Sequence, residues 1–188
     1  MDFDKCLKTR RSVRDYKDKK INIADLNQIL DAARYAPSAG NLQNWRFIIV
    51  ENEEKRKKLA EACLDQEFVA KVPVVIVVCD DSEDVVRHYG RRGKLYSIQN
   101  CSIVIQNIML KANDLGIGSC WVGAFDEDKI KALLKVPDSI RVEAIITLGY
   151  SNDKAEMPRR YDLKDLVYFE EWDITKRGSA FPLIKRKA

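Results

Sequence analysis

The sequence predicts an α+β protein of α/β/α type, in which a mixed sheet is flanked by helices on both faces. Two short β-branched apolar runs, Phe47–Val50 and Val74–Cys79, are typical of buried strands. The longest helical pattern, Ser97–Leu115, is apolar on nearly every side and is expected to be buried all round, in a core or at a subunit interface. Helices and strands alternate along the chain, which favours helices packed in layers on a sheet. The pattern does not decide between a sheet built from hairpins and one whose strands run in one direction.

Length and composition restrict the class of protein. The 188 residues suit one domain with a tail, and 46% hydrophobic residues are enough for a core. Charged residues make up 33%, but their mixed signs and the net charge of +4 argue against a nucleic-acid partner. The first ten residues hold no signal-like apolar run, and Val72–Cys79 is too short to cross a bilayer. We therefore expect a soluble cytoplasmic protein without membrane contact.

The first half of the chain is expected to contain two helices and a polar turn around the two strands. Asn22 and Asp25 resemble a capping box, and apolar residues at helical spacing continue to Ala36, before Pro37. A polar turn over Ser38–Asn41 follows, and a charged amphipathic helix over Glu53–Cys63 separates the two strands.

The second half continues this alternation after the long helix. Gly116 and Gly118 are expected to end that helix. Three further elements follow: a strand over Ser119–Ala124, a helix from Asp126 to Leu134 and a strand over Val142–Leu148.

The end of the chain is expected to be an arm. We predict a ligand-binding domain over residues 1–160 and an arm over residues 161–188, where the periodicity fades. The arm carries Phe169, Trp172 and Phe181, which would be costly to expose and need another surface. Packing on a partner subunit is the simplest solution.

The cysteines and the single histidine predict no metal site. The five cysteines contain no CxxC pair, and His88 is the only histidine. Cys79 and Cys101 lie within apolar segments, where a free cysteine is usually a small buried hydrophobe. We therefore expect a reducing compartment, and a bound cofactor for any redox chemistry.

Three polar segments are candidates for a ligand site. Arg10-Arg11-Ser12-Val13-Arg14 places three guanidiniums and a hydroxyl within five residues, which suits a phosphate. Pro37–Trp45 combines three side-chain amides with an indole, which can read the polar edge of a heterocycle. In Gly116–Gly123 the last glycine would let backbone N–H groups approach a flat ligand. Each segment alone favours the plainer interpretation, a solvated basic turn, a loop, or a helix end with a buried strand.

The order of these segments is more informative than any one of them. The chain has Arg-Arg-Ser-x-Arg at residues 10–14 and Pro-Ser-x-x-Asn-x-Gln-x-Trp at residues 37–45. Leu-Gly-Ile-Gly-Ser-Cys-Trp-Val-Gly follows at residues 115–123, and Pro-Arg-Arg at residues 158–160. Together they resemble the FMN-dependent nitroreductase family from about Asp4 to Trp172. The resemblance implies a mixed, mainly antiparallel sheet in an intertwined homodimer.

The resemblance implies a site for the FMN phosphate and for one side of the ring. Arg10, Ser12 and Arg160 would hold the phosphate, with Arg159 in the same late motif and Arg11 at the ribityl end. Arg14 would lie towards N1 and O2 of the flavin, where a cation raises the reduction potential because the reduced ring is negative at N1.

The resemblance also implies that two subunits share each flavin. Pro37, Ser38 and Asn41 would reach the flavin of the other subunit, and Gln43 and Trp45 would support their loop.

Further ring contacts are implied on the flavin's own subunit. Gln66 would lie at a flavin edge, and Trp121, Val122 and Gly123 would pass beside the ring with a backbone N–H near N5. No catalytic side chain is implied, and His88 is expected to be a surface or lid residue.

The reaction implied by the resemblance is ping-pong. NADH or NADPH stacks on the flavin, delivers hydride to N5 and leaves, and a small acceptor such as a nitroaromatic or quinone is then reduced in the same place. Two departures stand out: the family often has an acid where this chain has Asn100, and the lid segment Asp81–Lys94 is short and charged. A reduced lid suggests an open pocket with broad or unusual acceptors.

Three rival functions remain open at this point. Similar proteins perform reductive dehalogenation, azoline dehydrogenation or breakdown of the flavin itself. A flavin-binding regulator without turnover would share the fold. A basic nucleic-acid-binding domain would use the dispersed arginines Arg10, Arg11, Arg14, Arg91 and Arg92, and would be colourless with strongly salt-dependent binding.

Overall fold

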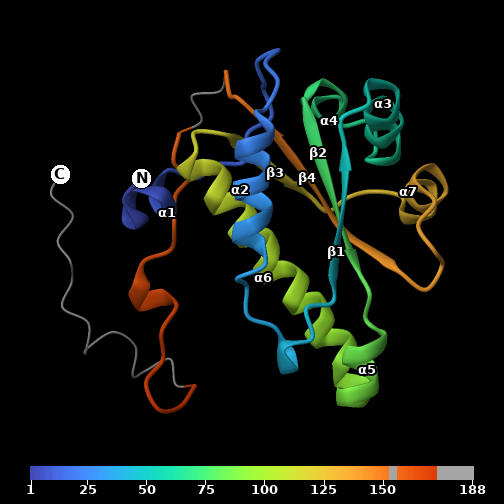
Figure 1. Ribbon diagram of the computed structural model, residues 1–188. Coiled ribbons are helices and arrows are strands. Elements are labelled where there is room, and N and C mark those ends of the chain that lie inside the picture. The colour runs from blue at the N-terminus through green and yellow to red at the C-terminus, as the bar shows by residue number, and fades with distance from the viewer. Residues whose placement is uncertain (153–155, 173–188) are drawn as a thin grey trace, which may run out of the picture. The chain divides into compact units, whose positions relative to one another are not determined.

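The computed structural model describes residues 1–152 and 156–172 (Figure 1). The chain divides into two units, Met1–Ala155 and Glu156–Ala188, which are described separately. Within the described ranges no helix is long and apolar enough to span a membrane. Phe181 and most of the predicted arm lie outside the described residues.

A four-stranded sheet forms the centre of the first unit. Its strands are β1 (Trp45–Val50), β2 (Val74–Asp80), β3 (Gly118–Val122) and β4 (Arg141–Gly149). Their order is β1-β2-β4-β3, and each neighbouring pair is antiparallel. In the part of the chain that the structure describes, the parallel component of the predicted mixed sheet is limited to one isolated bridge, Ser12 to Ser119.

The helices confirm most of the predicted elements. They are α1 (Phe3–Thr9), α2 (Ile23–Ala33), α3 (Glu53–Ala62), α4 (Phe68–Lys71), α5 (Glu83–Tyr89), α6 (Gly93–Asp114) and α7 (Glu127–Leu134), with 3-10 turns η1 (Ala39–Asn41), η2 (Gly90–Arg92) and η3 (Leu163–Asp165). Asn22, Asn52 and Asp126 accept hydrogen bonds from backbone N–H groups at the starts of α2, α3 and α7. Such caps stabilise a helix start by about 1 kcal/mol each.

Helices cover both faces of the sheet, as predicted (Figure 1). Alternate residues of β2 point to opposite faces: Ile76 packs with α2 and α6 in one apolar cluster, and Val77 packs with α3 and α7 in the other. Both side chains are fully buried. Burial of such a side chain stabilises the fold by about 1.5–3 kcal/mol. The run of β-branched residues in β2 therefore reflects a strand covered on both sides.

The long helix α6 is buried on only part of its surface within one chain. Cys101, Ile105 and Ile108 pack against the sheet and α2. Leu95 and Ile103 remain 47% and 40% exposed, although all-round burial was expected. The described residues of the chain therefore do not cover the outer side of α6 at these two positions, and its burial at a subunit interface stays a prediction.

Candidate functional site

The predicted site residues that belong to the first unit fall at two opposite edges of the sheet. One group, the β3 edge, consists of Arg10–Arg14, Gln66 and Trp121–Gly123. The other, the α2–β1 loop, consists of Pro37–Gln43 and leads into β1. Since β1 and β3 are the outer strands, three inter-strand spacings of about 4.8 Å each separate the two edges.

The segment Arg10–Arg14 runs along the free side of β3. Val13 N donates to Ser119 O at 2.9 Å, and Ser12 forms the isolated bridge with Ser119. A Cβ at Gly118 would lie 2.9 Å from Val13 Cγ2, so only glycine allows this close approach. Gly118 therefore serves the docking of the basic segment, rather than the helix end that the sequence suggested.

The buried side chain of Tyr16 holds the same segment through two hydrogen-bond contacts. Tyr16 Oη donates to Val13 O at 2.6 Å and lies 2.7 Å from Thr147 Oγ1 on β4. These bonds tie the chain that follows Arg14 to the interior of the sheet.

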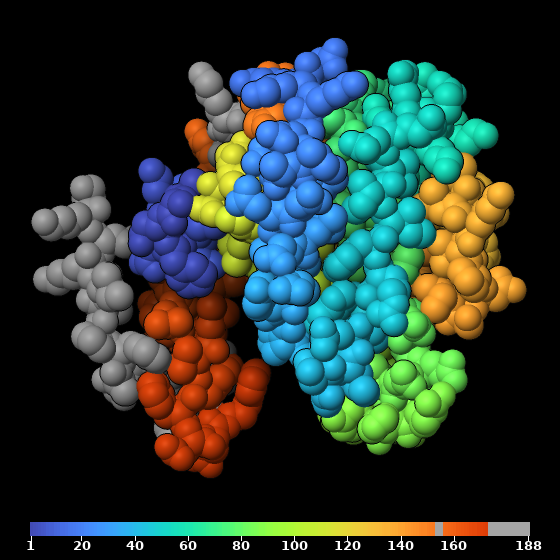
Figure 2. Space-filling model, viewed as in Figure 1, coloured from blue at the N-terminus to red at the C-terminus, as the bar shows by residue number. Residues whose placement is uncertain are grey.

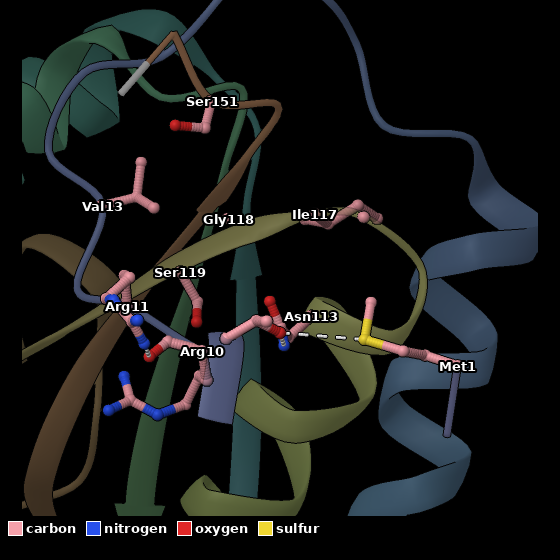
Figure 3. Close-up of a pocket in the computed structure, with 11 residues that line it drawn as sticks. Met1, Arg10, Arg11, Val13, Asn113, Ile117, Gly118, Ser119 and Ser151 are labelled. Atoms are coloured by element: carbon pink, nitrogen blue, oxygen red, sulfur yellow. Dashed lines mark hydrogen bonds between the residues drawn. The ribbon is translucent and has the colours of Figure 1, made fainter. Parts of the chain in front are cut away.

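A pocket of about 330 Å³ opens beside this segment (Figure 3). Arg10, Arg11, Asn113 and Ser119 are among its lining residues, and Figure 3 shows both arginine side chains on the same side of it. Two guanidiniums at one wall favour an anionic group.

Arg11 is already engaged by its own neighbours. Its Nη1 donates to Lys8 O at 2.7 Å and to Arg10 O at 2.8 Å, at the C-terminal end of α1. Its Nε is buried without a hydrogen-bond partner in the described structure. Arg11 therefore fixes the end of α1 and adds positive charge to the pocket wall, and its ribityl contact stays a prediction.

Gln66 lies next to the end of β3. Its Nε2 donates to Cys63 O at 2.8 Å and to Ala124 O at 3.3 Å. Leu64 and Asp65, just before it, have positive φ values of 57° and 56°. L-residues adopt this conformation at a cost, and it is common at functional loops.

Arg14 reaches towards the same place. Its Cζ lies 5.9 Å from the centre of the Phe68 ring, just after Gln66. The structure thus brings together Arg14, Gln66 and the end of β3, which are far apart in the sequence.

The predicted ring contacts differ in what they expose at this edge: they are Trp121, Val122 and Gly123. Trp121 is 38% exposed, whereas the Val122 side chain is buried in the core, so only the backbone of Val122 can face a ligand. A Cβ at Gly123 would meet only Trp121 Nε1, at 3.7 Å. The space beside Gly123 is open, which fits the approach of a flat ring to the backbone.

The β3 edge is electropositive. Burial raises the pKa of the Cys120 thiol, while the charges of Arg14 and Arg10 and a hydrogen bond from Ser12 act in the opposite direction. The two guanidiniums therefore act on the same point of β3.

The cysteines are buried free thiols, as predicted for Cys79 and Cys101. Burial raises the pKa of Cys63 to about 12 and that of Cys79 to about 11, and raises the pKa of Cys101 as well. These three thiols are protonated at neutral pH and are not poised as nucleophiles.

The α2–β1 loop has an unusual backbone. Gly40, Asn41 and Gln43 have φ values of 58°, 56° and 45°. Ser38 Oγ accepts from Gln43 N at 3.2 Å, and Gln43 Nε2 donates to Asn41 O and Oδ1, both at 3.1 Å. Three of the predicted residues thus hold one another in a strained turn.

A tyrosine of the predicted lid segment backs this loop. A Cβ at Gly40 would lie 2.9 Å from Tyr89 Oη. In Figure 2 the loop, in light blue, lies beside the green segment that contains α5. The predicted lid segment contains α5 and η2, and His88 lies exposed on α5, as expected for a surface residue.

Sequence reasoning missed a buried polar cluster behind the loop. It consists of Asn44, Asp80, Ser97 and Asn100, each at most 3% exposed. Asn100 Oδ1 accepts from Ala39 N at 3.0 Å, so Asn100 contacts the α2–β1 loop of its own chain. The one available signal was a polar residue directly after the apolar run of β2.

Arg159 and Arg160 belong to the second unit. Arg160 Nη1 lies 3.5 Å from Pro158 O, and both arginines line a pocket of about 440 Å³ with Tyr161, Asp162 and Asp165. Their contribution to a phosphate site stays a prediction. Tyr168 and Trp172 stack at 4.1 Å between ring centres within this unit.

Metal ligation has no candidate group in the described ranges. Over residues 1–152 and 156–172, no three His, Cys, Asp or Glu side chains lie close enough to hold an ion.

Comparison with known proteins identifies similar chains. A family model described as the Nitroreductase family matches residues 7–150. A protein of Archaeoglobus fulgidus named "Putative NADH dehydrogenase/NAD(P)H nitroreductase" is 38% identical over 179 residues, 90% of this chain and 100% of that protein.

Two solved structures agree with this match. A nitroreductase family protein from Clostridium novyi NT is 34% identical, with a TM-score of 0.76, over 84% of this chain and 90% of its own. An FMN-dependent nitroreductase from Clostridium difficile R20291 is 33% identical, with a TM-score of 0.76, over 89% of this chain and 98% of its own.

Proposed function

Because this chain belongs to the nitroreductase family, we propose that it is an NAD(P)H-dependent oxidoreductase that holds FMN along its β3 edge. The observation that carries the proposal is the convergence of Arg10, Ser12 and Arg14 with the open backbone at Gly123 on one side of the sheet. The names of the Archaeoglobus and Clostridium difficile relatives support the nicotinamide donor and the cofactor.

The phosphate end of FMN would lie in the pocket beside Arg10. The docking of residues 10–14 on β3 places the Arg10 side chain and the Ser12 hydroxyl near β3, and Arg11 adds a fixed charge. Charge-assisted hydrogen bonds from guanidinium groups are the strongest that a phosphate can receive. For Arg159 and Arg160, a contact with the phosphate stays a prediction from the resemblance alone.

The ring end would lie between Arg14, Gln66 and Gly123. Arg14 would provide a cation at the pyrimidine side, and the backbone beside Trp121 and Gly123 would pass along the ring. When bound, FMN takes two electrons from NADH or NADPH and passes them to a small organic acceptor such as a quinone or nitroaromatic. The protein's part is to orient both reactants over one exposed face.

The functional unit would be a homodimer. Leu95 and Ile103 leave apolar surface on α6, and the α2–β1 loop lies at the sheet edge opposite the β3 edge. Both facts are explained if α6 packs on a second copy, so that Pro37, Ser38 and Asn41 serve the partner's flavin. Buried free thiols fit a cytoplasmic, reducing compartment.

The first test is the visible spectrum of the protein purified without added flavin. We expect a yellow protein that releases FMN on denaturation. A colourless protein that takes up no FMN when the flavin is supplied in excess would contradict the assignment of the β3 edge.

A yellow protein leaves the acceptor to be identified. Steady-state oxidation of NADH or NADPH with an added quinone separates an enzyme from a flavin-binding regulator, because the regulator would show no turnover.

A further inference from the structure

We propose that Asn100 is a positioning residue for the α2–β1 loop, and that Asp80 determines through Asn44 which atom Asn100 presents to that loop. The role assigned to the loop rests on the proposed function, but the hydrogen-bond relay itself does not. We call the series Asp80, Asn44, Asn100 and Ala39 N the relay.

The relay begins at a buried carboxylate. Asp80 closes β2 and is fully buried. Asn44 Nδ2 donates to Asp80 Oδ1 at 2.6 Å, and Ser97 Oγ donates to Asp80 Oδ2 at 2.7 Å. Both oxygens of Asp80 thus act as acceptors, and an amide can serve an acceptor only with its nitrogen. Asn44 must therefore turn its nitrogen towards Asp80.

This orientation fixes the next two contacts. With its nitrogen turned to Asp80, Asn44 has its oxygen left for Asn100, and Asn100 Nδ2 donates to Asn44 Oδ1 at 2.6 Å. Asn100 is thereby left with its oxygen towards the loop, where it accepts from Ala39 N at 3.0 Å. The donor-to-acceptor direction is the same at each step, so the loop contact depends on a carboxylate three partners away.

The loop needs such an anchor. Asn41 and Gln43 hold positive φ values, a conformation that costs an L-residue free energy and persists where the surroundings enforce it. The hydrogen bond from Ala39 N to Asn100 attaches the start of this turn to α6. Tyr89 closes the other side next to Gly40.

Burial makes the relay specific. Asn44, Asp80, Ser97 and Asn100 are each at most 3% exposed, so water does not replace a missing partner easily. If Asn44 or Asn100 exchanges the positions of its amide nitrogen and oxygen, the other must do the same, so that a donor still faces an acceptor between them. The direction of the relay is therefore a property that an exchange of residues can test.

The decisive experiment moves the carboxylate from one end of the relay to the other. Asn100→Asp places a carboxylate on each side of Asn44, whose single amide nitrogen can face only one of them. In the double variant Asp80→Asn with Asn100→Asp, Asn44 can turn round, donate to residue 100 and accept from residue 80, although it then gives up the bond from its Nδ2 to Ser97 O at 3.2 Å. Residue 100 still offers an oxygen to Ala39 N.

Hydrogen exchange of the segment 37–43 is the readout, because it does not require flavin. In Asn100→Asp the new carboxylate faces Asn44 Oδ1, where Asn100 Nδ2 donated before, and the repulsion should push it out of the position that accepts from Ala39 N. We expect exchange of the segment to speed up by about tenfold or more, the factor for one lost hydrogen bond of ordinary strength. The double variant should return exchange towards the wild-type rate. Ser102→Ala removes a hydroxyl of α6 that bonds Ile98 O outside the relay, and should leave the segment unchanged.

Several results would overturn the relay. Unchanged exchange in Asn100→Asp would do so, as would a folded double variant that exchanges as fast as the single one. If Asn100→Asp does not fold, the wild type still decides the question: Ala39 N–H must be protected, and exchange as fast as in an unstructured peptide contradicts the proposal.

The flavin separates failure of the relay from failure of the proposed function. If wild type binds FMN and Asn100→Asp has an unchanged exchange rate, the relay is wrong and the function stands. If wild type takes up no FMN, the function is wrong, and the exchange rates still test the relay. If both hold, the FMN dissociation constant should rise in Asn100→Asp and recover in the double variant.

Discussion

Arg14 is the side chain through which the β3 edge would act on the flavin ring. Its guanidinium lies 5.9 Å from the centre of the Phe68 ring. Burial raises the pKa of Cys120, whereas the charge of Arg14, like that of Arg10, acts to lower it. We predict that Arg14→Ala weakens FMN binding by about tenfold to a hundredfold, the range for a lost hydrogen bond to a charged group. The flavin midpoint potential should also fall, because the cation stabilises the reduced ring.

Arg87→Ala is the matched control for Arg14→Ala. Arg87 lies exposed on α5 and pairs with Glu83 and Asp84. The Arg87→Ala variant should have the FMN dissociation constant and the flavin midpoint potential of the wild type. Equal values for wild type and Arg14→Ala would remove Arg14 from the site.

The buried thiols predict how stability depends on pH. The pKa of Cys79 is about 11 in the folded protein, against an ordinary value of 9.0. Above pH 9 the unfolded chain loses this proton and the folded chain keeps it, so the free energy of unfolding should fall as pH rises to about 11. Each such thiol contributes a slope of about 1.4 kcal/mol per pH unit.

Urea unfolding between pH 8 and pH 11 checks this prediction. Cys79→Ala should cost stability at pH 8, because it leaves a small cavity, but should reduce the slope above pH 9. An unchanged slope would show that Cys79 does not titrate differently on folding.

Two glycines at the β3 edge differ in what surrounds them: Gly118 begins β3, and Gly123 directly follows it. A Cβ at Gly118 would lie 2.9 Å from Val13 Cγ2, whereas a Cβ at Gly123 would meet only Trp121 Nε1, at 3.7 Å. We predict that Gly118→Val lowers the free energy of unfolding by about 1–3 kcal/mol, as overpacking does. Gly123→Val should leave stability nearly unchanged and weaken FMN binding, because its side chain fills the space proposed for the ring.

Thermal unfolding and FMN titration of the two variants distinguish these roles. Each glycine variant serves as the control for the other. Strong FMN binding by Gly123→Val would place the ring elsewhere.

The elements that the sequence predicted best are those with internal signals. The β-branched runs of β1 and β2 and the apolar pattern of α6 are local, and their bounds agree to within a few residues. The short helices α1 and α4 were not predicted, because four to seven residues carry little periodicity and depend on tertiary contacts.

The residues of the candidate site also differ in whether the sequence could predict them. Arg10, Ser12 and Arg14 could be found because they form one linear motif. The relay could not, because Asn44, Asp80 and Asn100 are brought together only by the pairing of β1 with β2 and the packing of α6. The role of Gly118 was misread for the same reason, since Val13 lies beside it only in the folded chain.

The whole molecule would work as two chains that complete each other's sites. The β3 edge and the α2–β1 loop lie at opposite edges of one sheet. Leu95 and Ile103 on α6 are exposed. We predict that Ile103→Glu yields a monomer in sedimentation experiments and loses FMN, because a buried charge at the interface is costly.

Lys55→Glu on α3 is the control for the added charge, since Lys55 is exposed on the opposite face of the sheet from α6. The Lys55→Glu variant should remain a dimer with bound flavin. A dimeric Ile103→Glu variant with normal FMN content would place the interface away from the outer side of α6.

The central claim is that this chain carries a flavin that a nicotinamide cofactor reduces. Anaerobic titration of the purified, flavin-loaded protein with NADH and with NADPH, followed at the visible flavin band, tests it most directly. We predict that at least one nucleotide bleaches the band with a stoichiometry of about one per flavin, as expected for a two-electron donor. A band that neither nucleotide bleaches would contradict the proposed oxidoreductase activity while leaving the flavin site in place.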